Sequence, residues 1–284
     1  MLLAIDIGNS SIKFGIFESG SLVNKFLIPT RPDYTIHELL FDRLRDIGGE
    51  FPRIDEVAVS SVVPELDEVL RQACGDLIKI TPVFIDHTFD FGLKINYEPV
   101  TAVGTDRLIN ASAAVKKYGE PLIVCSFGTA TTIDAVNSAG EYLGGTIAPG
   151  MNTLAEALHL KTSKLPLVAI EKPESVIGHT TVDSIRSGVF FGYIGLVEGL
   201  ISRIDAELLS AAEGLNTWSG SEGAVNVTAN KPSVIATGGF ARLIAENCDL
   251  IDTVDENLML EGIRMLFERR RRTHPETLDA SAPK

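Results

Sequence analysis

Apolar and polar positions in the first part of the chain follow the pattern of three short strands. Residues 2–7 form an apolar run that ends at Gly8, and residues 11–18 alternate between apolar and polar side chains. Alternation with a period of two is typical of a half-buried strand. The dipeptide Ser19-Gly20 is a turn signal, and residues 22–28 return as a further strand. The N-terminal segment is therefore predicted to form a meander.

The same pattern occurs again in the second half of the chain. An apolar strand over 122–127 ends at Gly128, a strand over 131–136 follows, and residues 142–147 return after the turn at Ala139-Gly140. Three turn-forming residues are in register at a separation of 120 positions: Gly8, Gly20 and Pro29 correspond to Gly128, Gly140 and Pro149. Matched turn residues between strands of the same order predict a duplicated unit.

The other predicted elements place strands and helices around these meanders. They are helices over 36–47, 65–74, 108–115, 182–209 and 258–272, and strands over 56–60, 82–85 and 234–236. This mixture predicts an α/β fold with a duplicated mixed sheet flanked by helices. We expect an N-terminal lobe over 1–118, a C-terminal lobe over 119–272, and a flexible tail over 273–284.

Composition narrows the class of protein. The hydrophobic fraction is 45% and the charged fraction 22%, as in soluble globular proteins. A net charge of −13 disfavours nucleic acid as a partner. No basic segment precedes the apolar start, and no apolar run looks long enough to cross a bilayer, so we expect a cytoplasmic protein without a membrane partner. Three dispersed cysteines support neither a zinc site nor a disulfide framework.

The first candidate site for chemistry is the hairpin from Asp6 to Lys13. A glycine at Gly8 lets the backbone approach a phosphate, and turn N–H and hydroxyl groups can donate to phosphate oxygens. Asp6 can hold Mg²⁺ and Lys13 can neutralise phosphate charge. An ordinary hairpin with a Gly-Asn turn is the competing interpretation.

Two further glycine turns follow apolar strands. Gly128-Thr129-Ala130-Thr131-Thr132 is a second candidate phosphate loop, and Thr237-Gly238-Gly239 follows the strand over 234–236 and precedes a helix. The alternatives are a strand start with outward polar residues for the first and a simple strand-to-helix turn for the second. Two matched hairpins, however, are typical of the actin/hexokinase/sugar-kinase architecture, in which a nucleotide binds between two ribonuclease-H-like lobes.

The fourth candidate is the pair Asp106-Arg107 at the start of the predicted helix over 108–115. Asp106 could accept the proton of an attacking hydroxyl, and Arg107 could bind a carboxylate. The alternative is an N-capping Asp beside a surface Arg.

These motifs, in this order, resemble those of type III pantothenate kinases over about residues 2–267. The matching segments are Asp6-Ile7-Gly8-Asn9-Ser10 with Lys13, Gly104-Thr105-Asp106-Arg107, Phe127-Gly128-Thr129-Ala130-Thr131-Thr132, Gly144-Gly145-x-Ile147-x-Pro149-Gly150, the segment 178–188, Thr237-Gly238-Gly239 and Leu258-x-Leu260-Glu261-Gly262.

The resemblance implies a fold of the actin/hexokinase/acetate-kinase superfamily and transfer of the γ-phosphoryl of ATP to pantothenate, the first step of coenzyme A synthesis. It implies Asp106 as catalytic base and a homodimer. The residues that it implies for ATP are Asp6, Ile7, Gly8, Asn9, Ser10, Ser11, Ile12, Lys13, Thr129, Gly238 and Gly239, with Mg²⁺ at Asp6. Those that it implies for pantothenate are Tyr97, Gly104, Thr105, Asp106, Arg107 and Thr181.

One position departs from the family pattern. The family carries an aspartate two residues before the second glycine loop, where it binds potassium or ammonium, and this chain has Ser126 there. A serine offers an oxygen without the charge. The expectation is that this protein does without the cation, binds it weakly, or is a less active relative.

Further functions remain open from the sequence. Some relatives of this type were first described as accessory factors for transcription, and the run from Arg269 to Arg272 could contact nucleic acid. A solvated helix end, where cations complement the dipole, is the simpler interpretation of that run. The same fold could also phosphorylate another small acceptor or serve as a nucleotide-binding structural module.

Overall fold

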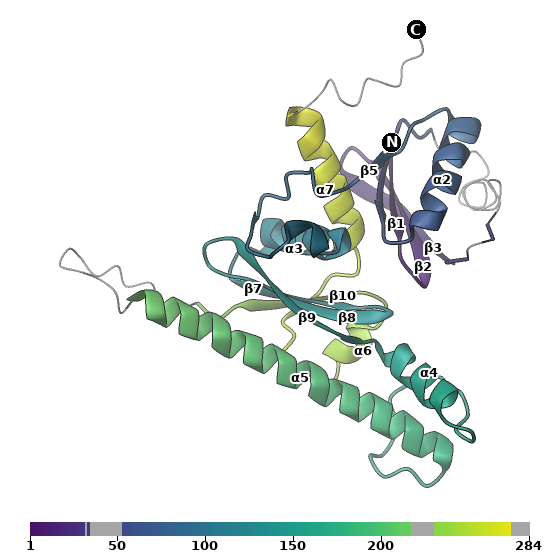
Figure 1. Cartoon of the computed structure of the whole chain (residues 1–284), viewed down its shortest axis with the longest axis vertical. Helices are drawn as coiled ribbons and strands as arrows, with labels where there is room; N and C mark the ends of the chain where they lie inside the picture. Colours follow the sequence, from purple (N-terminus) through teal and green to yellow (C-terminus); the bar gives the residue numbers. More distant parts are fainter. Residues whose placement is uncertain (32, 35–52, 217–229, 274–284) are drawn as a thin grey trace. The chain divides into compact units, whose positions relative to one another are not determined.

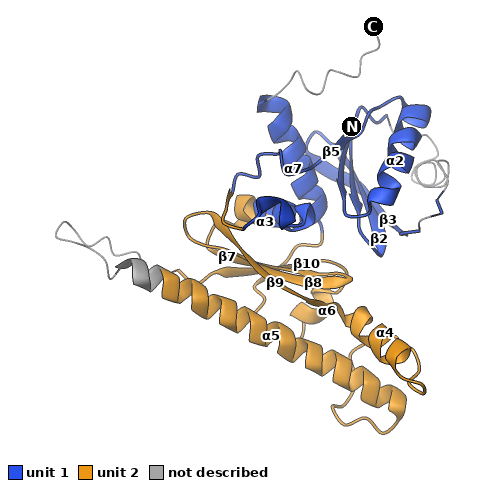
Figure 2. Cartoon of the chain, viewed as in Figure 1, with its two compact units in different colours: residues 1–93, 98–113, 257–284 blue, residues 94–97, 114–256 orange. Residues whose placement is uncertain are grey.

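The computed structural model describes residues 1–31, 33–34, 53–216 and 230–273, so the predicted helix over 36–47 and nearly all of the predicted tail lie outside the described residues. The chain divides into two compact units (Figure 2). Unit 1 comprises residues 1–93, 98–113 and 257–284, and unit 2 comprises residues 94–97 and 114–256. Each unit is built on a sheet of its own.

The sheet of unit 1 has the strand order β3-β2-β1-β4-β5. Four of these strands, β1, β2, β3 and β5, are labelled in Figure 1. The meander is antiparallel, and the two later strands run parallel to β1. Its strands are β1 (Leu2–Ile7), β2 (Ser11–Glu18), β3 (Ser21–Pro29), β4 (Glu56–Ser61) and β5 (Val83–Phe84).

The two faces of this sheet have different compositions, and each is packed differently. One face carries buried large side chains such as Ile5 and Phe14, which pack with Leu66 of α2 (Pro64–Ala73). The other face is small: Ala4 pairs with Gly15, and a Cβ added at Gly15 would lie 3.1 Å from Leu260 Cδ1 of α7 (Leu258–Thr273). The missing side chain lets α7 approach the sheet closely, so this helix belongs to unit 1.

The sheet of unit 2 has the order β11-β10-β7-β8-β9-β6. Five of its strands repeat the order of unit 1, which confirms the predicted duplication. Both meanders turn on a glycine with positive φ, +83° at Gly20 and +70° at Gly140, and both carry a bulge in the strand that follows. The strands of the unit 2 sheet are β6 (Lys94–Ile95), β7 (Leu122–Phe127), β8 (Ala130–Val136), β9 (Glu141–Pro149), β10 (Ser233–Thr237) and β11 (Thr253–Val254).

The helix α5 (Thr181–Asn216) forms much of the core of unit 2. Phe190, Tyr193 and Val197 are buried against β7 and β8 residues such as Phe127. By length and composition alone, the stretch Thr181–Ala211 could cross a membrane, with a mean hydropathy of 1.3. The sequence-based expectation that no run is long enough was therefore wrong, and the apolar side chains of α5 serve a core.

The remaining helical segments complete the two units. Alpha helix α3 (Thr105–Tyr118) contributes residues to both units. The others are the π-helix η1 (Cys74–Ile78), the 3-10 helix η2 (Val100–Ala102), and the α-helices α4 (Met151–Lys161) and α6 (Ala241–Ala245). The three cysteines are free and buried, and burial raises the pKa of the Cys74 thiol to about 12.

The compact units differ from the lobes predicted with a single boundary after residue 118. Residues 94–97 form an edge strand of the second sheet, and residues 257–284 group with the first. Both differences arise from contacts distant in sequence, which hydrophobic periodicity does not report.

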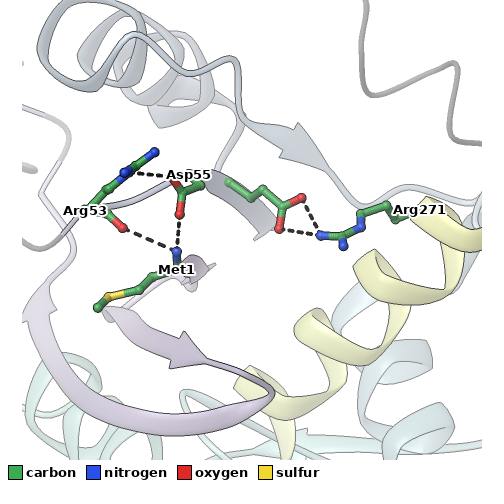
Figure 3. A network of polar contacts seen from close by, with 5 residues as sticks. Met1, Arg53, Asp55 and Arg271 are labelled. Carbon is green, nitrogen blue, oxygen red and sulfur yellow. Dashed lines mark hydrogen bonds and ion pairs between the residues drawn. The ribbon is translucent and has the colours of Figure 1, made fainter.

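The C-terminal arginine run has partners inside unit 1. Arg269 Nη1 donates to the Asp90 carbonyl at 3.0 Å, and Arg270 lies over the Phe89 ring with Cζ 4.4 Å from the centroid. Arg271 Nη1 donates to both carboxylate oxygens of Glu56, at 2.8 and 3.1 Å (Figure 3). Three of these arginines therefore help to fix α7 on unit 1.

Candidate active site

The hairpin of β1 and β2 places Asp6 and Lys13 opposite each other. The two residues are cross-strand partners, and Lys13 Nζ donates to Asp6 Oδ2 at 3.0 Å. The Asp6 side chain is 10% exposed, whereas the Lys13 side chain is 37% exposed. The carboxylate is thus held at a buried position while the ammonium group reaches solvent.

The loop of this hairpin is tied down by backbone bonds. The Gly8 N–H donates to the Ser11 carbonyl at 3.1 Å, and Thr30 Oγ1 donates to the Gly8 carbonyl at 2.6 Å. Asn9 and Ser10 are exposed at the tip. Ile7 and Ile12, both predicted to contact ATP, are fully buried in the core. Their side chains hold the hairpin, so any contact that they make with a nucleotide would come from the backbone.

Asp106 and Arg107 do not fit the N-cap interpretation. The helix α3 begins at Thr105, so Asp106 is its second residue, and its carboxylate folds back over Gly104. A carboxylate in the first turn is stabilised by the helix dipole. Arg107 is only 6% exposed and is therefore not a surface arginine.

A pocket of about 390 Å³ lies in unit 1 beside this turn. Gly104 and Thr105 line it, together with Val62, whose N–H donates to the Ile7 carbonyl at the end of β1. The pocket therefore borders both the turn that carries Asp106 and the loop that follows β4.

The walls of this pocket hold residues that the sequence did not single out. His87 lines it and its Nε2 is 2.8 Å from the Val103 carbonyl, which precedes the Gly104 turn. Asp67 lines it as well, with a buried Oδ1 that has no hydrogen-bond partner in the described part of the chain. No local pattern marks these residues, because the fold brings them together from separate segments.

In unit 2 the second hairpin loop is one residue shorter than the first, since Phe127 pairs with Thr131 whereas Ile7 pairs with Ile12. The Gly128 N–H donates to the Ala130 carbonyl at 3.1 Å, two residues further on, whereas the Gly8 N–H donates to Ser11, three residues further on. The Thr129 carbonyl accepts from the Gly150 N–H at 2.9 Å and from Thr153 Oγ1 at 2.7 Å. Thr129 itself is exposed.

The Gly238-Gly239 turn lies against the end of β7. Gly238 has φ +97°, and a Cβ added to it would lie 2.5 Å from the Phe127 carbonyl oxygen. The Phe240 N–H donates to that same carbonyl at 3.4 Å. This turn and the Gly128-Thr129 loop are therefore neighbours within unit 2.

We expect Gly238→Ala to be strongly destabilising and Gly239→Ala to be tolerated. The first change adds a Cβ at positive φ and against a backbone oxygen, which costs about 1–3 kcal/mol in backbone strain alone. A Cβ at Gly239 would meet nothing within 4 Å. Thermal unfolding checks the pair: a fall of about 4 °C or more in Tm is expected for Gly238→Ala only. Equal unfolding temperatures would contradict the steric argument.

In each sheet, strand pairing places three residues side by side across the hairpin and the neighbouring parallel strand, and we call such a set a row. Asp6 pairs with Lys13 on one side and with Ser60 of β4 on the other. Laterally paired residues share a face of the sheet. Ser60 is 0% exposed, and its Oγ has no hydrogen-bond partner within the described residues. The sequence did not identify Ser60, since only strand pairing brings it beside Asp6.

The corresponding row in unit 2 contains three hydroxyl groups. Ser126 pairs with Thr132 of β8 and with Thr237 of β10. No carboxylate or ammonium group occupies this row, in contrast to the row in unit 1.

The two remaining predicted substrate residues belong to unit 2. The Tyr97 ring packs on Gly144, where an added Cβ would lie 2.9 Å from Tyr97 Cδ2. Thr181 is the exposed first residue of α5, whose N-terminus is capped by Thr180 Oγ1 accepting from the Asp183 N–H at 3.1 Å. Gly104 to Arg107 belong to unit 1, so the predicted pantothenate set draws on both units.

Within the described ranges there is no cluster of three or more His, Cys, Asp or Glu side chains that could hold a metal ion. Asp6, with the buried hydroxyl of Ser60 beside it, is a single carboxylate in a polar setting. That donor set fits Mg²⁺ that arrives with nucleotide phosphates, because magnesium keeps several waters and needs few protein carboxylates.

Two sheets that share one order of five strands, each with a glycine hairpin, define the class of this protein as a two-unit α/β fold with a duplicated sheet. The family model described as type III pantothenate kinase matches residues 2–203. The chain belongs to the type III pantothenate kinase family.

Curated relatives agree along nearly the whole chain. A type III pantothenate kinase of Citrifermentans bemidjiense is 42% identical over 274 residues, covering 95% of this chain and 100% of the relative. A type III pantothenate kinase of Roseiflexus is 40% identical over 274 residues, with coverages of 95% and 100%. That of Bacillus cytotoxicus is 38% identical over 272 residues, with coverages of 95% and 96%.

A solved structure described as a conserved putative Baf family transcriptional activator from Campylobacter jejuni has the same fold. Its TM-score is 0.55 at 19% identity, and the match covers 95% of this chain and 99% of that one. A likeness at this identity supports the fold alone.

Proposed function

We propose that this protein transfers the γ-phosphoryl group of ATP to the primary hydroxyl of pantothenate, forming 4'-phosphopantothenate in the first step of coenzyme A synthesis. Family membership over nearly the whole chain supports this reaction. The observation that carries it is the pocket of about 390 Å³ in unit 1, which is lined by Gly104 and Thr105, the two residues that directly precede Asp106. An acceptor in this pocket would lie next to the first turn of α3, which carries the Asp106 carboxylate.

Asp106 is the proposed general base. The hydroxyl oxygen of pantothenate forms a bond to the γ-phosphorus, the bond from that phosphorus to the bridging oxygen breaks, and ADP leaves. The hydroxyl proton passes to the Asp106 carboxylate. Such a base needs hydrogen-bond reach more than an unusual pKa, and the rigid first turn of α3 supplies a fixed position.

Asp6 and Lys13 are proposed to hold the charged end of the nucleotide. Bound Mg²⁺ would neutralise developing charge on the phosphates. Asp6 would hold the ion, directly or through water, and Lys13 would turn its exposed ammonium group from Asp6 toward a phosphate oxygen. The Gly8–Ser11 loop would approach the phosphates with its backbone.

The remaining assignments are also part of the proposal. In unit 2, Thr129 would contact ATP and the Gly238-Gly239 turn would let the nucleotide approach the backbone closely. Tyr97, Thr181 and the Gly104–Arg107 segment would bind pantothenate. Arg107 would pair with its carboxylate, because a guanidinium group can donate two parallel hydrogen bonds to that group.

A role in transcription gains no specific support from the arginine run. Arg269 donates to the Asp90 carbonyl, Arg270 to Thr88 Oγ1 and Arg271 to the Glu56 carboxylate, so all three side chains have partners inside unit 1. Contact with nucleic acid would need another surface.

We further propose that the protein acts as a homodimer through an apolar surface on unit 2. Exposed apolar side chains lie on α4 and on the segment between α4 and α5: Leu158, Leu160, Leu167, Val176 and Ile177. On α5, Gly188, Gly192 and Gly195 have no neighbour near an added Cβ, which leaves a backbone surface open to close packing. A second copy would cover both features.

The double change Leu160→Asp with Ile177→Asp is expected to convert the dimer to a monomer. Each side chain is about three-quarters exposed, at 76% and 74%, so the changes should cost the fold of one copy little. Light scattering after size exclusion measures the mass. Leu27→Asp, on a 67% exposed leucine of β3, is the matched control and should leave the mass unchanged. A double variant with the wild-type mass would contradict this interface.

The proposed reaction is tested with purified protein, ATP, Mg²⁺ and pantothenate, by detecting ADP and phosphopantothenate. Formation of both in equal amounts is expected. Protein that binds ATP but phosphorylates no pantothenate would overturn the substrate assignment.

A further inference from the structure

We propose that Thr132, Ser126 and Thr237 form an uncharged site for the phosphate chain of the nucleotide, which binds phosphate oxygens directly and needs no monovalent cation. This inference rests on the proposed use of ATP. It concerns only unit 2 and does not depend on the acceptor.

The three residues lie side by side at the same end of the sheet. Ser126 is paired with Thr132 on the antiparallel strand and with Thr237 on the parallel strand. Neighbouring strands are about 4.8 Å apart, so the side chains form one continuous row. They lie on the face opposite to α5, because the alternate residues Cys125, Ile133 and Ala236 belong to the core that α5 covers.

The row is adjacent to both glycine turns of this unit. Ser126 is two residues before Gly128, and Thr237 directly precedes Gly238, which packs on the Phe127 carbonyl. A phosphate held by the turns would therefore lie close to the hydroxyl groups.

The three hydroxyl groups are available as hydrogen-bond donors. In the described ranges, none of the three has a hydrogen bond from its side-chain oxygen, whereas Thr131 on the opposite face is bonded to Tyr193. Thr237 is only 3% exposed, so its surroundings are largely protected from bulk water. Each hydroxyl group can donate one hydrogen bond, so a ligand with acceptor oxygens would find donors in this row.

The row in unit 2 differs in charge from the corresponding row in unit 1. The row Lys13–Asp6–Ser60 contains an anion that can hold Mg²⁺ and a cation that can meet a phosphate. A carboxylate in the unit 2 row would repel phosphates unless a cation lay between them. Three hydroxyl groups remove that requirement, because each can donate directly to a phosphate oxygen.

The test measures ATP binding by calorimetry without pantothenate, in potassium chloride and in choline chloride at the same ionic strength. Wild-type affinity is expected to agree within about twofold in the two salts. Ser126→Asp should lose about tenfold or more in choline and recover in potassium.

A second set of variants tests the hydroxyl groups without adding charge. Ser126→Ala with Thr237→Val should weaken ATP binding by about tenfold or more in both salts, because hydrogen bonds to a charged ligand are lost. Thr131→Val makes the same threonine-to-valine change on the opposite face and should leave ATP affinity within about twofold.

Two results would overturn the inference alone: wild-type ATP binding that needs potassium, or wild-type ATP affinity in the variant that lacks both hydroxyl groups. ATP binding that is insensitive to salt and depends on the hydroxyl groups, without pantothenate turnover, would contradict only the proposed reaction. Protein that binds no ATP in either salt would contradict both.

Discussion

Asp106→Asn is expected to lower kcat for pantothenate phosphorylation by about 10²–10⁴-fold, the usual contribution of a general base. The amide has nearly the shape of the carboxylate but cannot accept the hydroxyl proton. Asp106 lies in the first turn of α3 over Gly104, so the change should leave the turn in place. Steady-state kinetics and calorimetric titration with ATP together check this prediction, because ATP affinity should change by less than about threefold.

Loss of a first-turn carboxylate also weakens a favourable interaction with the helix dipole, worth about 0.3–1 kcal/mol. Glu65→Gln makes that same loss in the first turn of α2, at an exposed side chain. It is expected to retain wild-type kcat, which separates the chemistry from helix stability. An Asp106→Asn enzyme with wild-type kcat would remove Asp106 from the mechanism.

Asp6→Asn is expected to have the second largest effect, a loss of about 100-fold or more in kcat/KM for ATP. An amide is a weaker ligand for magnesium than a carboxylate, and Lys13 loses the partner that lies 3.0 Å away. Titration with Mg²⁺ at fixed ATP should show a higher magnesium requirement.

The variant Lys13→Met distinguishes loss of a metal contact of Asp6 from loss of the Asp6–Lys13 ion pair. It breaks the same pair but keeps the carboxylate, so ATP affinity should fall while the magnesium requirement at a given ATP occupancy stays near that of the wild type. If both variants shifted the magnesium requirement equally, the ion pair rather than a metal contact of Asp6 would explain the result.

Local sequence signals predicted much of the framework. The strands that became β1, β2, β7 and β8 were recognised because alternating apolar residues and turn glycines act within a few positions. The duplication was visible because its turn residues kept their spacing, and the fold confirms it. The order of motifs also pointed to the correct family, to which the chain belongs.

The sequence alone did not predict which distant segments of the chain contact each other. The position of α7 depends on the small residues Ala4 and Gly15 being paired across two strands, which leaves room for Leu260. The burial of Arg107 and the partners of Arg271 likewise depend on segments far away in the chain. Such contacts carry no local periodicity. They produce compact units whose bounds differ from the predicted boundary after residue 118, and they decide against the alternative that Arg107 is a surface residue.

The amino-acid sequence by itself determined the two hairpins, their glycines and the Asp106-Arg107 pair, because strand alternation and turn chemistry are local properties of the chain. Only the tertiary structure decided that Ser60 stands beside Asp6 and Thr237 beside Ser126. The reason is physical: a parallel pairing joins strands through a long connection, and its register is set by packing of the whole sheet rather than by a turn.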